Sequence, residues 1–386
     1  MNNDIYKQSL DLHGEYGGKL ETKSKIKLDS KEVLSLAYSP GVAEVSRVIA
    51  LDPALAKTYT LKKNTIAIVS DGSAILGLGN LGPLAAIPVM EGKACIFKEF
   101  ADVDAFPICL DTQDTEEIIK IVKNIAPVFG GINLEDISAP RCFEIEERLR
   151  RELDIPVMHD DQWGAATVTL AALINSLKLL DQDFKNKKDT YKIVMSGVGA
   201  AGVATARLLD VYGFKNIIYC DSHGIIHKGR TDLNKEKVEL IENSKALPKE
   251  GKLEDAIIEA QVFIGLSKPN TLTKEMVKTM SDRPIIFALA NPTPEIMPED
   301  ALEAGAYIVA TGRSDYPNQI NNSLVFPGAF KGMLENNIPQ FKIEMFSAIA
   351  ESLAESLKDV STNKIIHSMF DKEVVDIVRE TIKKFK

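Results

Sequence analysis

Tryptophan, cysteine and histidine are scarce in this chain of 386 residues, which has one, four and five of them. The cysteines Cys95, Cys109, Cys142 and Cys220 are scattered, without the paired spacing of a zinc site or a disulfide framework. This pattern argues against a disulfide-stapled secreted domain and against a zinc module. We interpret the four cysteines as small apolar residues in a reducing compartment.

A secretory signal is also not evident, because the first residues lack an apolar core, and we expect a cytoplasmic protein. Residues 72–90 carry no charge and are about long enough to cross a bilayer. Four glycines and two prolines within them would break the continuous helix that lipid demands. We predict a buried loop and strand there, and no association with a membrane.

Positive charge is in deficit, with 46 Lys and Arg against 55 Asp and Glu and a net charge of −9. A chain this acidic has no general electrostatic reason to bind nucleic acid. The remaining composition, 45% hydrophobic and 26% charged, is ordinary for a globular enzyme of two domains.

The first part of the chain mixes predicted helices and strands without a regular order. Helical spacing of apolar residues predicts helices at 4–13, 30–37, 51–59, 115–126, 141–153 and 164–180. Short apolar runs predict strands at 65–70, 94–97, 105–110 and 155–158.

A regular alternation begins after this part. Strands are predicted at 192–196, 216–220, 262–266, 284–289 and 307–310, with helices between them. Strands that alternate with helices indicate a doubly wound parallel sheet. After Pro327 the chain has a wholly helical pattern. We therefore predict an α/β protein with a mixed α/β domain at 1–160 and a dinucleotide-binding domain with C-terminal helices at 161–386.

The sequence GVGAAG follows the predicted strand at 192–196 and opens a helix. Its glycines permit a tight turn and close approach of the backbone to a pyrophosphate at the helix N-terminus, as in a Rossmann fold. The alternative is a glycine-rich turn that holds no ligand. The candidate cofactor-binding residues are Gly197, Gly199, Ala200, Ala201 and Gly202.

Asp221 ends the next strand, at the distance from the glycines where a carboxylate accepts from the ribose hydroxyls of NAD. This residue favours NAD over NADP. His223, His227, Lys228 and Arg230 follow closely and could pair with a phosphate, so NADP stays open.

Acidic residues follow two apolar segments. Glu135 and Asp136 end GGINLED, and Asp160 and Asp161 follow PVMH. Strand ends converge in open α/β folds, and carboxylates brought together repel unless a cation neutralises them. An all-oxygen set selects Mg²⁺ or Mn²⁺ over zinc. Two unrelated exposed acidic turns are the alternative.

Lys93, in an apolar neighbourhood, could lose its proton more readily and act as a general base. A lysine whose stem packs while its head reaches water is the alternative. Tyr38 stands before a Pro-Gly turn and is either a proton donor or a packing residue. The amides of Asn291, Asn321 and Asn322 could donate to a carboxylate substrate or simply form turns.

Taken together, these segments resemble the malic enzymes, in the same order and from about residue 10 to residue 385. The segments are YSPGVA at 38–43, VSDGSAILGLGNLG at 69–82, EGKACIF at 91–97, GGINLEDI at 130–137, HDDQWGAA at 159–166, GVGAAG at 197–202, ANPTPE at 290–295 and NNSLVFPG at 321–328. The length is similar to that of the compact prokaryotic form.

The resemblance implies oxidative decarboxylation of (S)-malate to pyruvate and carbon dioxide with NAD or NADP and Mg²⁺ or Mn²⁺. By motif, Lys93 would be the general base, Tyr38 the acid that protonates the enol, and Asp160 the residue that orients Lys93. The implied metal ligands are Glu135, Asp136 and Asp161, and the implied substrate amides are Asn291, Asn321 and Asn322, with Asn291 also near the cofactor. The family also suggests a homodimer.

One departure from the family is the pair Ser73-Ala74, where the larger eukaryotic-type enzymes carry an arginine that pairs with malate. Either another cation serves, or metal, amides and loop backbone hold the dicarboxylate. Two other functions stay open. A malolactic enzyme shares these motifs but releases lactate, and a catalytically dead nucleotide- or metabolite-binding protein would need neither an acid nor a base.

Overall fold

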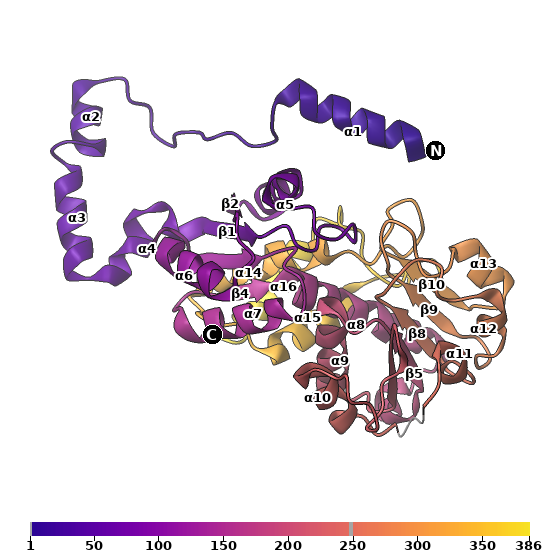
Figure 1. Cartoon of the computed structure of the whole chain (residues 1–386). Coiled ribbons are helices and arrows are strands. Elements are labelled where there is room, and N and C mark those ends of the chain that lie inside the picture. The colour runs from indigo at the N-terminus through magenta and orange to yellow at the C-terminus, as the bar shows by residue number, and fades with distance from the viewer. Residues whose placement is uncertain (1, 247–249) are drawn as a thin grey trace.

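The computed structural model describes residues 2–246 and 250–386 and contains two parallel-stranded sheets flanked by helices (Figure 1). The first sheet has the order β2-β1-β3-β4 and is parallel throughout. Its strands are β1 Thr65–Ser70, β2 Asp104–Cys109, β3 Gly131–Leu134 and β4 Val157–His159. The helices associated with it are α5 Pro83–Ala101, α6 Thr115–Ile125 and α7 Arg141–Glu152. The predicted α/β class is confirmed.

Helix α5 corrects two expectations from the sequence. Residues 83–101 are helical, so the strand expected at 94–97 does not exist and residues 72–90 do not form a buried strand. Leu84 is 81% exposed, which also contradicts burial of that stretch. The spacing of the buried side chains explains why these residues form a helix. Ala86, Met90, Ala94 and Phe97 recur every three or four residues and so share one helix face. Pro83 begins the helix, where its missing N–H costs no hydrogen bond.

Helix α8, Asp160–Leu180, follows β4 directly and forms the central core helix. It is the one helix in residues 2–246 and 250–386 that is long and apolar enough to cross a membrane, but 78% of its apolar window is buried inside the protein. Its contacts with α9 (Ala200–Tyr212) and α15 (Ile343–Ser356) explain this apolar surface as core packing.

The second sheet has the order β10-β9-β8-β5-β6-β7. Strands β5 Ile193–Ser196, β6 Ile217–Asp221, β8 Val262–Gly265, β9 Ile285–Ala288 and β10 Ile308–Thr311 are parallel. The short β7 Gly224–Ile225 is antiparallel to β6, which the sequence did not predict. Helices α9 Ala200–Tyr212, α10 Lys235–Asn243, α11 Leu253–Ala256, α12 Lys274–Lys278 and α13 Pro298–Glu303 connect the strands. The doubly wound sheet is confirmed.

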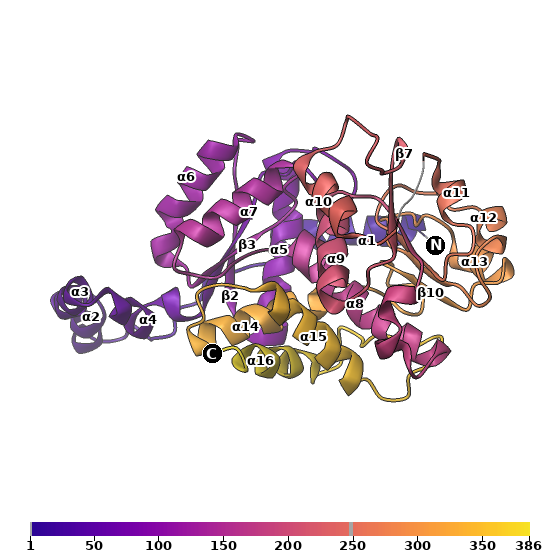
Figure 2. The ribbon, with the colours of Figure 1, turned by 90° about the horizontal axis from the view of Figure 1, so that it is seen from below.

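The C-terminal helices return to the first sheet layer, although they follow the second sheet in sequence. They are α14 Phe326–Asn336, α15 Ile343–Ser356 and α16 Val374–Lys383, grouped together in Figure 2. Between α15 and α16 the chain is irregular, so this part is not wholly helical. The rings of Phe326 and Phe97 of α5 lie 4.8 Å apart, and Arg150 of α7 donates to the carbonyl of Phe341. The division of the chain at residue 160 stays a prediction.

The N-terminal segment, residues 2–64, projects from this body in its middle part (Figures 1 and 2), while Lys19 contacts α5 by donating its Nζ to the Pro88 carbonyl oxygen over 2.6 Å. It contains α1 Asn2–Tyr16, α2 Lys31–Ala37, α3 Val42–Leu51 and α4 Ala56–Tyr59. No side chain from residue 5 to residue 64 is buried. Of the 27 exposed large hydrophobic side chains of the described chain, 15 lie in this arm.

Candidate active site

Lys93 is the centre of a buried charged cluster. Its Nζ lies 2.5 Å from Asp160 Oδ2 and 2.6 Å from Glu135 Oε1. The same ammonium lies 4.3 Å from the centre of the Phe326 ring. Lys93 comes from the middle of α5, Glu135 follows β3, and Asp160 begins α8, so parallel strands that end at one edge bring the charges together.

The charge state of Lys93 depends on its two carboxylate partners. Burial alone would lower its pKa, but the Asp160 and Glu135 carboxylates outweigh burial and raise the pKa above the usual range of lysine. The neighbours of the Lys93 ammonium are therefore two carboxylates as well as the apolar Phe326 ring, and the role of Lys93 as a general base stays a prediction. Burial raises the pKa values of Glu135 and Asp160, while Lys93 opposes that rise.

Asp136 and Asp161 adjoin this cluster. The Asp136 backbone N–H donates to Asp161 Oδ2 over 2.8 Å, and Asp136 Oδ2 is buried without a hydrogen-bond partner. Burial, and next the Asp161 charge, raises the pKa of Asp136 to about 7. Within residues 2–246 and 250–386 no three His, Cys, Asp or Glu side chains form a ready cluster for a metal ion. The donors are nevertheless all carboxylates with a buried oxygen to spare, which fits a hard divalent cation.

Asn322 also reaches the cluster. A Cβ added to Gly164 would lie 2.9 Å from Asn322 Cβ and 2.0 Å from Asp160 Oδ1. Glycine at this position in the first turns of α8 therefore lets Asn322 approach Asp160. Asn321 next to it is used locally, because its Oδ1 accepts from the Ser323 N–H at the start of a short 3-10 turn.

Asn291 lies between the two sheet regions. A Cβ on Gly312, after β10, would lie 2.6 Å from Asn291 Nδ2, and a Cβ on Gly77 would lie 2.5 Å from the Asn291 carbonyl oxygen. Asn291 thus contacts both the loop after β10 and the glycine-rich loop of the first sheet.

Tyr38 is the one predicted catalytic residue that the described chain does not bring to Lys93. It is the C-cap residue of α2 on the N-terminal arm and is 70% exposed. Lys93, by contrast, is 6% exposed in the body.

The glycine turn has the local geometry that the sequence predicts. Gly197 has φ +103°, and a Cβ there would lie 2.3 Å from the Leu266 carbonyl oxygen after β8. A Cβ on Gly202 would lie 2.1 Å from the Gly197 carbonyl oxygen, so glycine allows α9 to pack onto the turn. Gly199 faces open space. The turn lies at the carboxyl end of β5, between β6 and β8, where the strand order reverses.

Asp221 holds two cations at the end of β6. Arg230 donates to both of its carboxylate oxygens, over 2.8 and 3.0 Å, and Lys237 of α10 donates over 2.7 Å. The His223 backbone N–H adds a fourth hydrogen bond. Burial opposes these contacts, but together they lower the pKa of Asp221 to about 2.

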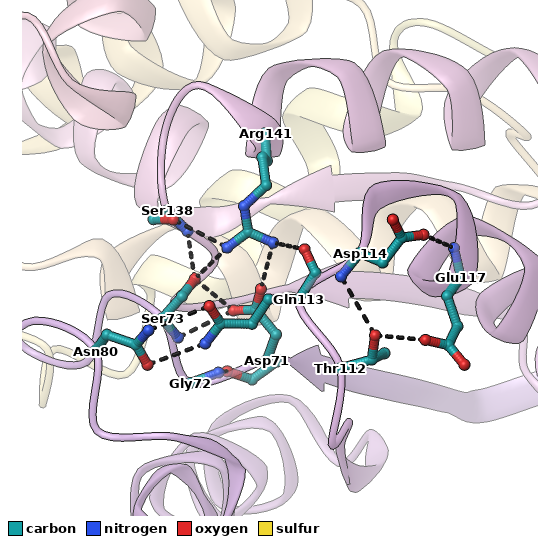
Figure 3. Close-up of polar contacts among 11 residues, drawn as sticks. Asp71, Gly72, Ser73, Asn80, Thr112, Gln113, Asp114, Glu117, Ser138 and Arg141 are labelled. Atoms are coloured by element: carbon teal, nitrogen blue, oxygen red, sulfur yellow. Dashed lines mark hydrogen bonds and ion pairs between the residues drawn. The ribbon is translucent and has the colours of Figure 1, made fainter.

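Arg141, the first residue of α7, ties together three loops at the strand ends of the first sheet (Figure 3). Its Nη1 lies 3.0 Å from Asp71 Oδ2 and also donates to the Gln113 carbonyl oxygen in the loop after β2. Its Nη2 donates to Ser73 Oγ and Ser138 Oγ over 3.0 and 3.1 Å. Asp71 in turn accepts from the Ser73 hydroxyl over 2.5 Å. The guanidinium of Arg141 therefore reaches the Ser73 segment, although it comes from α7 and not from the segment itself.

Several residues of this region were missed by the sequence analysis. Phe326 lies in NNSLVFPG and Glu295 in ANPTPE. An apolar residue and a residue in a turn are common in such segments, so neither residue indicated a role in the site. Glu295 is fully buried and accepts from the Ser267 and Ala290 N–H groups of the loops after β8 and β9. Glu146 and Lys237 lie on ordinary amphipathic helices, so only the tertiary structure finds them.

Family models for the two halves of a known enzyme match this chain. Residues 17–150 match the malic enzyme N-terminal domain, and residues 163–377 match the malic enzyme NAD-binding domain. The chain belongs to the malic enzyme family.

Relatives of similar length support this assignment. An NAD-dependent malic enzyme of Geobacillus stearothermophilus is 54% identical over 95% of this chain and 76% of its own length. A bifunctional malic/malolactic enzyme of Bacillus subtilis is 51% identical over 98% of this chain and 92% of its own. The crystal structure of an NAD-dependent malic enzyme of Thermotoga maritima is 48% identical, with a TM-score of 0.92, over 97% of this chain and 98% of that chain. The malic enzyme relatives include NAD-dependent and NADP-dependent proteins.

Proposed function

We propose that this malic enzyme catalyses the oxidative decarboxylation of (S)-malate to pyruvate and carbon dioxide, with reduction of NAD or NADP. The observation that carries this function is Lys93, buried between Asp160 and Glu135. Burying a lysine and two carboxylates costs desolvation free energy. A catalytically dead binding protein has no need for such a buried amine, so this alternative is disfavoured.

Glu135, Asp136 and Asp161 are the residues that would hold Mg²⁺ or Mn²⁺. When bound, NAD or NADP would supply the hydride acceptor, and a divalent cation would supply positive charge against the substrate oxygens. The orphaned Asp136 oxygen and the all-carboxylate donor set support this assignment.

Lys93 accepts the proton of the malate hydroxyl as the hydride leaves C2. To do so it first gives up a proton of its own. Two carboxylates contact its Nζ, and of these Asp160, which is not among the proposed metal ligands, is the one to receive or orient that proton. Tyr38 gives a proton to C3 of the enol after carbon dioxide has left. The side-chain amides of Asn291 and Asn322 donate to the substrate carboxylate.

NAD is the proposed cofactor, held by the glycine turn at 197–202. Asp221 is ionised and pairs Arg230 and Lys237, so these cations neutralise the carboxylate and are not free for a 2′-phosphate. An ionised carboxylate at this place favours a ribose diol.

A homodimer is the proposed assembly, with the N-terminal arm docked on a second copy. The arm leaves 15 large hydrophobic side chains exposed and buries none of its own residues from 5 to 64, which is unusual for a free surface. A second copy would cover this surface. It would also let Tyr38 of one protomer approach Lys93 of its partner, because the two lie on separate parts of one chain.

Malolactic activity is the second candidate. The similarity to the bifunctional Bacillus subtilis enzyme favours it, because the same site residues could retain the reduced cofactor and pass the hydride to pyruvate.

The experiment that tests the function follows absorbance of the reduced cofactor with malate and Mn²⁺, with NAD and NADP in parallel, and quantifies pyruvate and lactate. We expect pyruvate and reduced cofactor in equal amounts, with NAD preferred. Lactate without net reduced cofactor would support the malolactic reaction, and neither product would contradict both.

A further inference from the structure

Glu146 is a buried carboxylate that neither the family motifs nor the reaction assigns a role. It lies on the inner face of α7 and is 4% exposed. Among the residues that the structure describes, no Lys, Arg or His side chain forms an ion pair with it. A buried carboxylate without a cation is costly unless hydrogen bonds compensate it.

Three donors compensate Glu146, and all belong to one short segment. Its Oε1 accepts from the His159 backbone N–H over 3.0 Å. Its Oε2 accepts from Gln162 Nε2 and Trp163 Nε1, each over 3.1 Å. The segment is the junction of β4 and α8, so Glu146 fixes this junction from the neighbouring helix.

The two residues between these donors are Asp160 and Asp161. Asp160 contacts Lys93, and Asp161 accepts from the Asp136 N–H. Because 100° of rotation separates successive residues of a helix, their directions depend on how the first turn of α8 is held. The His159 side chain does not cap this helix, so the Glu146 carboxylate also supplies negative charge at the helix N-terminus.

We propose that Glu146 is a positioning residue, which holds the first turn of α8 so that Asp160 faces Lys93 and Asp161 faces Asp136. The inference rests on the proposed function, in which these carboxylates orient the base and hold the divalent cation. A carboxylate is required because three N–H donors need acceptors on both oxygens. Glutamine has nearly the same volume but would turn an NH₂ group toward at least one donor.

The test compares Glu146→Gln with Glu144→Gln in the full-length protein. Glu144 lies on the same helix, but its side chain is 59% exposed and pairs with Arg148, so it is a matched control. Trp163 is the only tryptophan in the chain, so its fluorescence reports directly on the hydrogen bond to Glu146. The readouts are Mn²⁺ affinity, NADH affinity, Trp163 emission and kcat for malate oxidation.

For Glu146→Gln we expect a shifted Trp163 emission, unchanged NADH binding, and Mn²⁺ affinity and kcat each lower by about 10- to 100-fold. Glu144→Gln is expected to match the wild type in all four. A merely structural role would lower the melting temperature but leave the Mn²⁺ affinity of the folded protein unchanged. That result, with the emission shifted, would overturn the positioning role.

Failure of the proposed function gives a different result. A wild type that binds Mn²⁺ but does not oxidise malate contradicts the function, while the Mn²⁺ comparison still decides the role of Glu146. A wild type that binds no Mn²⁺ overturns both. If Glu146→Gln does not fold, Gln162→Leu and Trp163→Phe each remove one donor and keep the carboxylate. We then expect smaller losses of Mn²⁺ affinity, and no loss in either variant would overturn the inference.

Discussion

Lys93 and Asp160 form the closest charged contact of the site, with 2.5 Å between Nζ and Oδ2 and no exposure of Asp160. The lysine reaches this contact from α5, and the aspartate from the first residue of α8. Removing one partner of such a pair leaves an uncompensated buried charge. The same contact also gives Lys93 a direct neighbour for proton exchange.

Lys93→Ala is expected to reduce malate oxidation by roughly 10²- to 10⁴-fold, because the reaction loses its base. Cofactor binding is expected to be retained, since the glycine turn is on the other sheet. Steady-state rates and NADH titrations measure both. Lys98→Ala is the control, because Lys98 lies on the same helix and pairs with Asp102 and Asp104 at the surface. A kcat near that of the wild type would remove Lys93 from the mechanism.

Asp136→Asn and Asp161→Asn are each expected to weaken Mn²⁺ binding without changing the fold, because a hard cation loses a charged ligand. Isothermal titration measures the affinity, and circular dichroism the fold. Asp154→Asn, at an exposed position, is the control. Titrations of both variants that overlay on the wild type would place the metal elsewhere.

Asp221→Ser is expected to weaken NAD binding more than NADP binding, because the serine accepts less strongly from the ribose and frees Arg230 and Lys237 for a phosphate. The pKa of Asp221 is lowered to about 2, so its carboxylate stays ionised at all working pH values. Asp221 is therefore expected to add no pH dependence of its own to NAD binding between about pH 5 and pH 8. Parallel kcat/KM measurements with both cofactors check this. An unchanged preference in the variant would assign the choice to other residues.

Tyr38→Phe is expected to slow malate oxidation and to slow deuterium exchange at C3 of pyruvate, because the enol loses its acid. If the arm docks on a partner, mixing Tyr38→Phe with Lys93→Ala protomers restores activity, since one site of each mixed dimer is intact. Random assembly of equal amounts would give about a quarter of the wild-type activity. No restoration after co-expression would place Tyr38 and Lys93 of one chain in one site. Exchange at the wild-type rate in Tyr38→Phe would assign the proton to another acid.

Arg141→Ala is expected to destabilise the protein by about 3 kcal/mol, because it leaves the fully buried Asp71 without its ion pair. Urea unfolding measures this loss. Arg151→Ala is the control, because Arg151 lies near the end of the same helix with its side chain 69% exposed. Equal stability of the two variants would show that Asp71 is satisfied without Arg141.

Local patterns in the sequence were sufficient for much of the second sheet and for the glycine turn. Apolar runs indicate its parallel strands because both faces of such a sheet are buried. The segment GVGAAG predicts a dinucleotide-binding turn because all of its structural requirements lie within one strand–turn–helix unit. The sequence offered the approach of Glu135 to the Asp160 segment as one of two alternatives, because the ends of parallel strands converge, and the structure shows both carboxylates at Lys93. In α5, periodicity was misread, since prolines and glycines near its start obscured a helical spacing.

The tertiary structure alone decided features that depend on residues far apart in the chain. The charged state of Lys93 is set by carboxylates 42 and 67 positions away, and the support of α8 is set by Glu146 on another helix. The C-terminal helices return to the first sheet because their apolar faces pack there, around Phe97, which no local pattern indicates. The sequence determined which chemical groups the site has, since each group belongs to a short motif that can be read without the fold. Their partners and charge states required the fold, because electrostatic and packing energies depend on distance in space and not on distance along the chain.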